Sequence, residues 1–332
     1  MKSRKRVVHR DILNHCYQNT VNGNLIFYSV SDYLVYFTLF CTIARKLKVK
    51  VLMLCLMPDH IHYSAVVKHG SILSGFNQET ASKFVLSQNR YSACSGSLMN
   101  HPFGSAVKKG DKIARTNIIY VGNNPVERRI VTKAEDYRWN FLAYALSDHP
   151  FSEKLVLSNA TRPLRRALKT VDLAYSQGNP LSYPVLKGMF SKLSKGESQQ
   201  LTDYIVSKYL VIDFNETARF FDSFGNMIEA MHSSTGSEYD INEVFVGTSD
   251  AYYSRMIQIL IRELKLKDIH EILSYSTERK FELYRLLRIK TDAPGAQIAK
   301  LLRMPFRRSS ADDFPVFDGG PVFDDVPVFN GK

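Results

Sequence analysis

An apolar strand followed at once by two closely spaced histidines is the feature that most constrains the fold of this chain. Residues 49–57 are apolar over the length of one strand, and Pro58-Asp59 is a typical turn pair. Residues 60–67 are therefore predicted to form the partner strand of a hairpin. Because alternate residues of a strand share one face, His60 and His62 should project together, about 7 Å apart along the backbone. Two such imidazoles can bind one metal ion, although an isolated H-x-H pattern also fits ordinary sheet histidines.

The segments on either side of this hairpin predict a sheet packed with helices. Apolar residues recur at helical spacing from Tyr33 to Ala44, after the cap signal Ser31-Asp32, so residues 7–67 should run strand, helix, strand, strand. Further along, we expect a helix at 71–87, a loop and strand at 98–108, and a helix at 111–121 that ends at Asn123-Asn124-Pro125. This alternation favours an α+β fold in which helices cover an antiparallel sheet.

The pattern becomes helical after about residue 150. Helices are expected at 160–177, 189–210, 216–232 and 252–264, after a linker within 147–162. We therefore predict three parts: a catalytic domain at 1–150, a mostly α-helical appendage at 151–310 that could bind DNA, and an acidic tail at 311–332. Residues 281–302 are similar to the first part of a helix-turn-helix. No recognition-helix pattern follows in 303–310, so a plain helical hairpin fits equally well.

The C-terminal tail repeats Pro-Val-Phe three times with a six-residue step, at Pro315, Pro321 and Pro327. Its Pro, Gly and Asp content predicts a disordered tail, with a repeated docking motif or a mimic of DNA charge as alternatives. The chain carries a net charge of +12, and the tail from Asp312 on contributes −4, which leaves +16 on the rest. Such a charge indicates an anionic partner, which could be nucleic acid, a membrane surface or the ribosome.

Cysteine spacing and hydropathy indicate a cytoplasmic protein with no membrane partner. The four cysteines are far apart and form no C-x-x-C pair, which is typical of reduced thiols. No apolar run of secretory type follows the basic start of the chain, and the best apolar stretch, 33–44, is too short to span a bilayer.

A tyrosine and an asparagine form the second candidate element. If residues 118–124 are helical, Tyr120 and Asn124 are four residues apart and share one helix face. A phenol and an amide oxygen would then point the same way. Taken alone, such a tyrosine is more typical of an amphipathic core position, with a buried ring and its hydroxyl at the edge.

Taken together and in order, these motifs resemble the HUH single-tyrosine transposases, and most closely the REP-associated tyrosine transposases, over about residues 10–145. The landmarks are His15-Cys-Tyr-Gln18, Asn22-Gly-Asn-Leu-Ile-Phe27, Cys55-Leu-Met-Pro-Asp-His-Ile-His62, Tyr120 with Asn124-Pro125, and Glu135-Asp-Tyr-Arg-Trp139. Several ordered motifs at this spacing are more specific than any one of them.

The resemblance implies an HUH fold with a ferredoxin-like core. His60 and His62 would be metal ligands, Tyr120 the nucleophile, and Asn124 would stand where related enzymes place a third ligand, commonly a glutamine. The chain departs from the family at Gly122-Asn123 and at 95–103, where a more basic and aromatic stretch is usual.

The implied reaction is metal-dependent cleavage and rejoining of single-stranded DNA, often beside a hairpin, through a 5′-phosphotyrosine. Mixed nitrogen and oxygen ligands suit Mg²⁺ or Mn²⁺, and a homodimer is a further expectation from the family. Basic residues should line the DNA path. The candidates are Arg4, Lys5, Arg6, Lys108, Lys109, Arg128, Arg129 and Arg138, together with a helical stripe of Arg162, Arg165, Arg166 and Lys169.

Two other functions compete with this enzyme. One is a catalytically inactive or domesticated protein that descends from such a transposase and binds DNA repeats without cutting them. The other is a nucleotide hydrolase with histidines on one strand. The hydrolase would need a further histidine at the next alternate position, where Ser64 stands.

Overall fold

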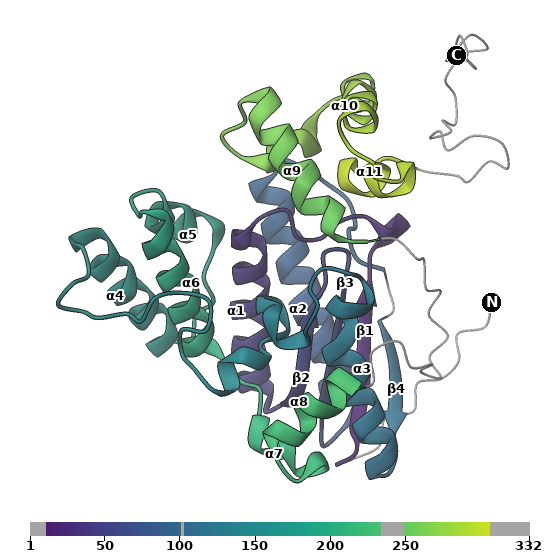
Figure 1. Cartoon of the computed structure of the whole chain (residues 1–332), viewed down its shortest axis with the longest axis vertical. Coiled ribbons are helices and arrows are strands. Elements are labelled where there is room, and N and C mark those ends of the chain that lie inside the picture. The colour runs from purple at the N-terminus through teal and green to yellow at the C-terminus, as the bar shows by residue number, and fades with distance from the viewer. Residues whose placement is uncertain (1–10, 101–102, 234–248, 306–332) are drawn as a thin grey trace, which may run out of the picture.

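The computed structural model describes residues 11–100, 103–233 and 249–305, and it has an α+β architecture (Figure 1). Its four strands are β1 (Leu13–Asn19), β2 (Lys50–Leu56), β3 (His60–Val66) and β4 (Gly104–Lys108). They form one sheet in the order β2-β3-β1-β4, and every neighbouring pair is antiparallel. Between and after them lie α1 (Val30–Leu47), α2 (Gly70–Tyr91) and α3 (Asp111–Glu127). The predicted antiparallel sheet with helices is confirmed.

The two faces of the hairpin β2-β3 meet different helices. Tyr63 packs its ring against Phe40 of α1 and Phe76 of α2, with ring centroids 5.4 and 5.7 Å away. The alternate residues of β3 face α3 instead. The contact that shows this is a hydrogen bond of 2.7 Å, which Ser64 Oγ donates to Asn117 Oδ1 of α3. The sheet thus buries an apolar face under α1 and α2 and holds the polar face, with both histidines, under α3.

The N-cap of helix α1 lies two residues before the predicted cap signal Ser31-Asp32. Ser29 is the N-cap, and its side chain accepts from Asp32 N while the Asp32 carboxylate accepts from Ser29 N. This is a capping box, in which the two residues satisfy each other's backbone donors. The acidic residue that the sequence marked as the helix start therefore lies inside the first turn.

Helix α3 continues through Pro125 to Glu127, so the predicted end at Asn123-Asn124-Pro125 was wrong. A proline inside a helix leaves a carbonyl of the preceding turn without its backbone donor. In α3 that carbonyl is Val121 O. The next carbonyl, Gly122 O, accepts a hydrogen bond of 3.3 Å from Asn140 Nδ2, a residue beyond the end of the helix. The same turn holds the departure Gly122-Asn123. A Cβ on Gly122 would lie 2.6 Å from the Met231 side chain, and Asn123 Nδ2 donates to Met231 O.

The described residues after 151 form helices. These are α4 (Arg162–Ser176), α5 (Tyr183–Phe190), α6 (Lys195–Tyr209), α7 (Phe214–Ala218), α8 (Phe224–Ser233), α9 (Ala251–Leu264), α10 (Thr277–Lys290) and α11 (Gly295–Leu302). Short 3-10 helices are η1 (Val21–Gly23), η2 (Ala134–Asp136), η3 (Arg138–Asn140), η4 (Leu142–Ala145), η5 (Arg219–Phe221) and η6 (Ile269–Ser274). Two predicted helices are each divided, because a capping box at Ser194 starts α6 and Asp222 has φ +67° before α8.

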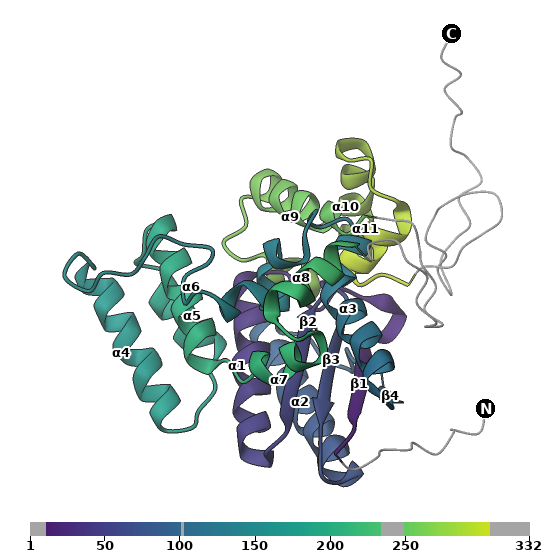
Figure 2. The same ribbon diagram turned by 60° about the horizontal axis from the view of Figure 1, so that its bottom comes forward.

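These helices pack in two groups. Helices α4 to α6 lie on the side of α1 that faces away from the sheet, as both views show (Figures 1 and 2), and they share one apolar core with it. Helices α9 to α11 form a second apolar cluster, which also takes in Leu25 and Tyr28 from the segment before α1. The domain boundaries stay a prediction, and residues 1–10 and the tail from 306 on lie outside the described residues.

A buried charge network connects the start of α1 with η6, which lies between α9 and α10. Asp32 Oδ2 accepts from the backbone N–H groups of Tyr28 and Ser29 at 2.9 and 2.8 Å. Its Oδ1 accepts from the Tyr183 hydroxyl at 2.6 Å and lies 2.9 Å from His270 Nε2. Burial alone would raise the pKa of Asp32, but the His270 charge and these hydrogen bonds lower it. Burial likewise opposes the charge on His270, yet Asp32 and Asp268 raise its pKa to about 9.

Replacing Asp32 with asparagine should destabilise the fold by about 3–5 kcal/mol, because it leaves the His270 charge buried without its main partner. The raised pKa of His270 adds stability below about pH 6.5, and that contribution is lost as the pH rises through about 9. Urea unfolding at pH 6 and pH 9.5 measures both effects.

The matched control is Asp172→Asn, which removes a carboxylate paired with Lys208 at a half-exposed site. It should change stability by less than about 1 kcal/mol. The Asp32 variant should also show a smaller fall in stability between the two pH values than the unaltered protein. Equal losses for the two variants would contradict the account of the network.

Candidate active site

The register of β1 against β3 gathers aromatic and histidine side chains on the face under α3. Tyr17 pairs with His62, and His15 pairs with Ser64. Adjacent strands put paired and diagonal side chains within contact of each other. The neighbouring strand thus brings a third histidine beside His62, and the His15 and His62 rings stack with centroids 5.3 Å apart.

His60 is held by a carboxylate that is itself held by the C-terminal helices. His60 Nδ1 lies 2.6 Å from Asp59 Oδ1, and the other carboxylate oxygen of Asp59 accepts from Lys300 Nζ at 3.1 Å. Burial would raise the pKa of Asp59, but its contact with His60 and the positive charges of Lys300 and Arg128 keep it well below its usual range. The ionised carboxylate can only accept, so the His60 ring donates from Nδ1. His60 Nε2 is buried and has no hydrogen-bond partner among the described residues.

His62 and His15 are both buried and both uncharged at neutral pH. Burial lowers the pKa of His62 well below its usual value, and the repulsion that a protonated His62 would meet from His60, His15 and Arg128 lowers it further. Burial, with the charge of Lys108, lowers the pKa of His15 to about 3. Neutral imidazole is the form that binds metal ions, so His62 is ready to ligate without losing a proton first.

Helix α3 places Tyr120 over these rings. The Tyr120 ring meets His62 and His15 edge to face, with centroids 5.5 and 5.7 Å away. Asn124 lies one turn after it on the same helix face, as the spacing predicted, and Asn117 lies one turn before it. Asn124 Nδ2 donates to Tyr120 O at 2.9 Å, so the amide nitrogen is used within the helix and the amide oxygen is the atom suited to a metal.

A divalent metal fits part of this arrangement. His60 and His62 have ring centroids 4.9 Å apart, and the buried, unpaired Nε2 of His60 is a ligand atom in need of a partner. Within the described ranges, however, no three His, Cys, Asp or Glu residues are placed to hold a metal together. The protein would therefore supply two imidazoles, and the remaining ligands would be an amide oxygen, water or substrate. Asn124 as third ligand stays a prediction.

The predicted DNA-binding residues are spread over several surfaces. The positive charge of Arg128 lowers the pKa of both His62 and Asp59, so Arg128 lies near them. The charge of half-buried Lys108 likewise lowers the pKa of His15. Lys109 and Arg129 are exposed. Arg138 is largely buried and contacts Gln199 and Asp203 of α6, and its role in DNA binding stays a prediction. Arg4, Lys5 and Arg6 lie outside the described residues.

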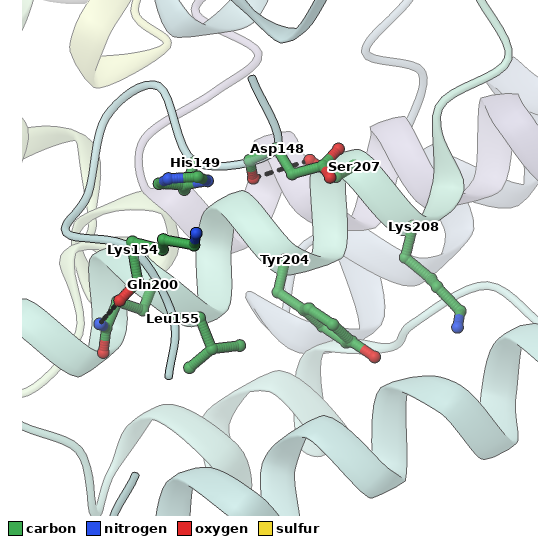
Figure 3. Close-up of a pocket in the computed structure, with 8 residues that line it drawn as sticks. All are labelled: Asp148, His149, Lys154, Leu155, Gln200, Tyr204, Ser207 and Lys208. Carbon is green, nitrogen blue, oxygen red and sulfur yellow. Dashed lines mark hydrogen bonds between the residues drawn. The ribbon is translucent and has the colours of Figure 1, made fainter. Parts of the chain in front are cut away.

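The predicted basic stripe is present on α4. The four side chains are exposed, while Leu164, Ala167, Leu168 and Val171 of the same helix are buried. Beside this helix group, a cavity of about 390 Å³ opens between α6 and the segment 148–155 (Figure 3). Its polar side chains are largely engaged already, because Ser207 Oγ donates to Asp148 O and Lys208 pairs with Asp172. The cavity is distinct from the histidine cluster.

Four residues of the cluster were not predicted from the sequence: His15, Tyr17, Asp59 and Lys300. Tyr17 stacks over Gly104 of β4 so closely that a Cβ there would lie 1.9 Å from its ring. His15 and Tyr17 alternate on the first strand, which was a usable signal once the pairing of β1 with β3 was known. Asp59 directly precedes His60. Nothing in the local sequence around Lys300 points to this site.

Comparison with known proteins gave limited similarity. No family model matches the chain, and no curated protein matches it. A solved structure described as a REP-associated tyrosine transposase bound to a REP hairpin is similar over 49% of this chain and 98% of that chain. The identity is 15% and the TM-score 0.38. A similarity of this size does not identify a function. Separately, no helix in the described ranges is both long and apolar enough to cross a membrane.

Proposed function

We propose that this chain is a metal-dependent DNA transposase or endonuclease of the HUH type, which cleaves and rejoins single-stranded DNA through Tyr120. The observation that carries the proposal is the edge-to-face contact of the Tyr120 ring with the neutral His62, with His60 on the same strand face. The element order β-α-β-β-α-β and the sheet order β2-β3-β1-β4 support a ferredoxin-like core. A tyrosine on a helix above two strand histidines is the arrangement that this chemistry requires.

The proposed step is an exchange of one phosphate ester for another. Tyr120 Oη forms a bond to the phosphorus, the bond from phosphorus to the 3′-oxygen breaks, and the DNA remains joined to the enzyme through its 5′-phosphate. The phenol loses its proton and the departing 3′-oxygen gains one. A divalent cation, Mg²⁺ or Mn²⁺, would stabilise the charge that develops on the phosphate. Attack by another 3′-hydroxyl reverses the exchange, so rejoining needs no ATP.

The chain's own residues prepare this step before DNA arrives. Burial keeps His62 neutral, and Asp59 fixes the His60 ring so that Nε2 is its ligand atom. Arg128 adds positive charge near the histidines, which favours a phosphate there. Each group acts by position and charge, which is the main source of catalysis in phosphoryl transfer.

Metal dependence tests this proposal. The protein is incubated with labelled single strands and hairpins from DNA flanking its gene, with Mg²⁺, Mn²⁺ or EDTA. We expect a denaturant-resistant protein–DNA adduct with either metal and none with EDTA. DNA binding without an adduct under any condition would instead support the inactive repeat-binding protein. Release of a nucleotide product without DNA attachment would support the hydrolase.

The exposed stripe on α4 should contribute to DNA binding by pairing with phosphates. Replacing Arg162, Arg165, Arg166 and Lys169 with glutamine should weaken hairpin binding. It should also lower the slope of log affinity against log salt by about one for each phosphate that the helix no longer neutralises. Fluorescence anisotropy across a salt series measures both quantities.

Helix α10 offers a matched control, since it also carries four exposed basic residues: Arg279, Arg285, Arg288 and Lys290. Their replacement with glutamine should change the slope less than the α4 variant does. Equal changes would show that binding depends on overall charge, and an unchanged α4 variant would remove this helix from the interface.

A further inference from the structure

We propose that His15 is a positioning residue, which holds the proton on His62 Nδ1 and so makes His62 Nε2 the atom that faces the metal. The inference rests on the proposed function and assigns a role to a residue that the reaction does not otherwise use. His15 lies on β1, on the same sheet face as the two proposed ligands. It is diagonal to His62, because the residue opposite it on β3 is Ser64, two residues from His62.

The distance between two ring nitrogens of His15 and His62 carries this inference. His15 Nε2 lies 3.0 Å from His62 Nδ1, and both residues are buried. Two ring nitrogens at hydrogen-bond distance share one proton, so one donates and the other accepts. If His62 Nδ1 carries the proton, then the lone pair of the neutral His62 ring is on Nε2. A His15 that accepts at Nε2 thus holds His62 in the Nδ1–H tautomer, and the tautomer determines which nitrogen can bind a cation.

His60 indicates the direction of the hydrogen bond between His62 and His15. His60 donates from Nδ1 to the Asp59 carboxylate at 2.6 Å, which leaves the buried Nε2 as its ligand atom. With His15 as acceptor, His62 has the same arrangement, and both proposed ligands offer Nε2. Metal-binding histidines commonly donate their second ring N–H to an outer partner, which orients the ring and raises its basicity. Here the outer partner of His60 is the Asp59 carboxylate, and the outer partner of His62 is the His15 imidazole.

His15 is better placed to hydrogen-bond a metal ligand than to bind the metal itself. The described residues contain no three His, Cys, Asp or Glu side chains placed to hold a metal together, so His15 does not complete a site with His60 and His62. The Tyr120 ring packs edge to face on both His15 and His62, which confines the two imidazoles in their stack. His15 is thereby fixed between β3 and the proposed nucleophile.

Mn²⁺ affinity, measured by calorimetry on the full chain without DNA, tests this role. His15→Leu removes the acceptor at similar volume, and we expect about a ten- to hundredfold weaker Mn²⁺ binding. His15→Gln places an amide oxygen near the position of the lost Nε2, and it should restore affinity to within about threefold of the unaltered protein. His69→Leu, at an exposed histidine, is the matched control and should leave affinity unchanged.

The outcomes separate this role from the proposed function. Unaltered affinity in His15→Leu overturns the positioning role and leaves the metal site standing. Equal losses in His15→Leu and His15→Gln overturn it as well, because the imidazole itself would then be a ligand. If the unaltered protein binds no Mn²⁺, the positioning role and the proposed function both fail.

A second measurement needs no variant. In metal-free protein, long-range ¹H–¹⁵N correlation spectra show which nitrogen of His62 carries the proton. We expect Nδ1–H on His62, with Nε2 unprotonated. A proton on His62 Nε2 would mean that His15 donates, and it would overturn the proposal even if His15→Leu fails to fold.

Discussion

Replacing Tyr120 with phenylalanine should abolish covalent attachment to DNA and leave DNA affinity nearly unchanged. The hydroxyl is the attacking group in the proposed step, whereas binding depends mainly on phosphate contacts made by basic residues elsewhere. The ring itself stays, so its packing on His62 and His15 should persist. Adduct formation on a denaturing gel and affinity by anisotropy measure the two parts separately.

Tyr17 provides the matched control for this variant. Its ring centroid lies 6.3 Å from that of His62, close to the 5.5 Å of Tyr120, and it comes from a strand on the same sheet face. Tyr17→Phe should keep adduct formation. If Tyr17→Phe loses the adduct and Tyr120→Phe retains it, the nucleophile is on β1 and the assignment to α3 is wrong.

Replacing His62 with alanine should remove metal-dependent cleavage and weaken Mn²⁺ binding by at least about a hundredfold. Outer partners of ligating histidines already contribute about ten- to hundredfold, and loss of a ligand should cost no less. His62 is the buried, neutral imidazole beneath Tyr120, so its loss removes the ligand nearest the proposed nucleophile.

His69→Ala is the control for His62→Ala, because His69 is exposed and follows the same strand. It should bind Mn²⁺ and form the adduct as the unaltered protein does. Thermal unfolding without metal should be recorded for each variant, since His62 is fully buried. A folded His62→Ala protein with unaltered Mn²⁺ affinity would show that the metal is bound elsewhere.

Local rules predicted much of the catalytic half of the fold. Strand alternation correctly predicted that His60 and His62 share one face of a strand. Helical spacing predicted that Tyr120 and Asn124 share one face of a helix. Both patterns depend only on neighbouring residues. The turn at Pro58-Asp59 fixed the hairpin for the same reason. The tyrosine and the histidines could be assigned to one site only through the family resemblance, since their contact depends on how α3 packs on the sheet.

Long-range pairing explains what the sequence did not predict. His15 meets His62 only because β1 pairs with β3 in a particular register, and Lys300 lies 241 residues from Asp59 in the chain. The end of α3 was misplaced at a turn that distant residues hold in place. Asn140 donates to Gly122 O and Met231 O accepts from Asn123, and tertiary contacts of this kind are invisible to local patterns.

The central claim is that Tyr120 becomes covalently joined to DNA, and peptide mapping of the adduct tests it most directly. Trypsin cleavage after Arg115 and Arg128 releases residues 116–128, which contain Tyr120 as their one tyrosine. After reaction with a single strand and digestion of the DNA, mass spectrometry should find the remaining nucleotide on Tyr120 through a 5′-phosphate. A nucleotide on another residue, or cleaved DNA with a free 5′-phosphate and no modified peptide, would contradict the account.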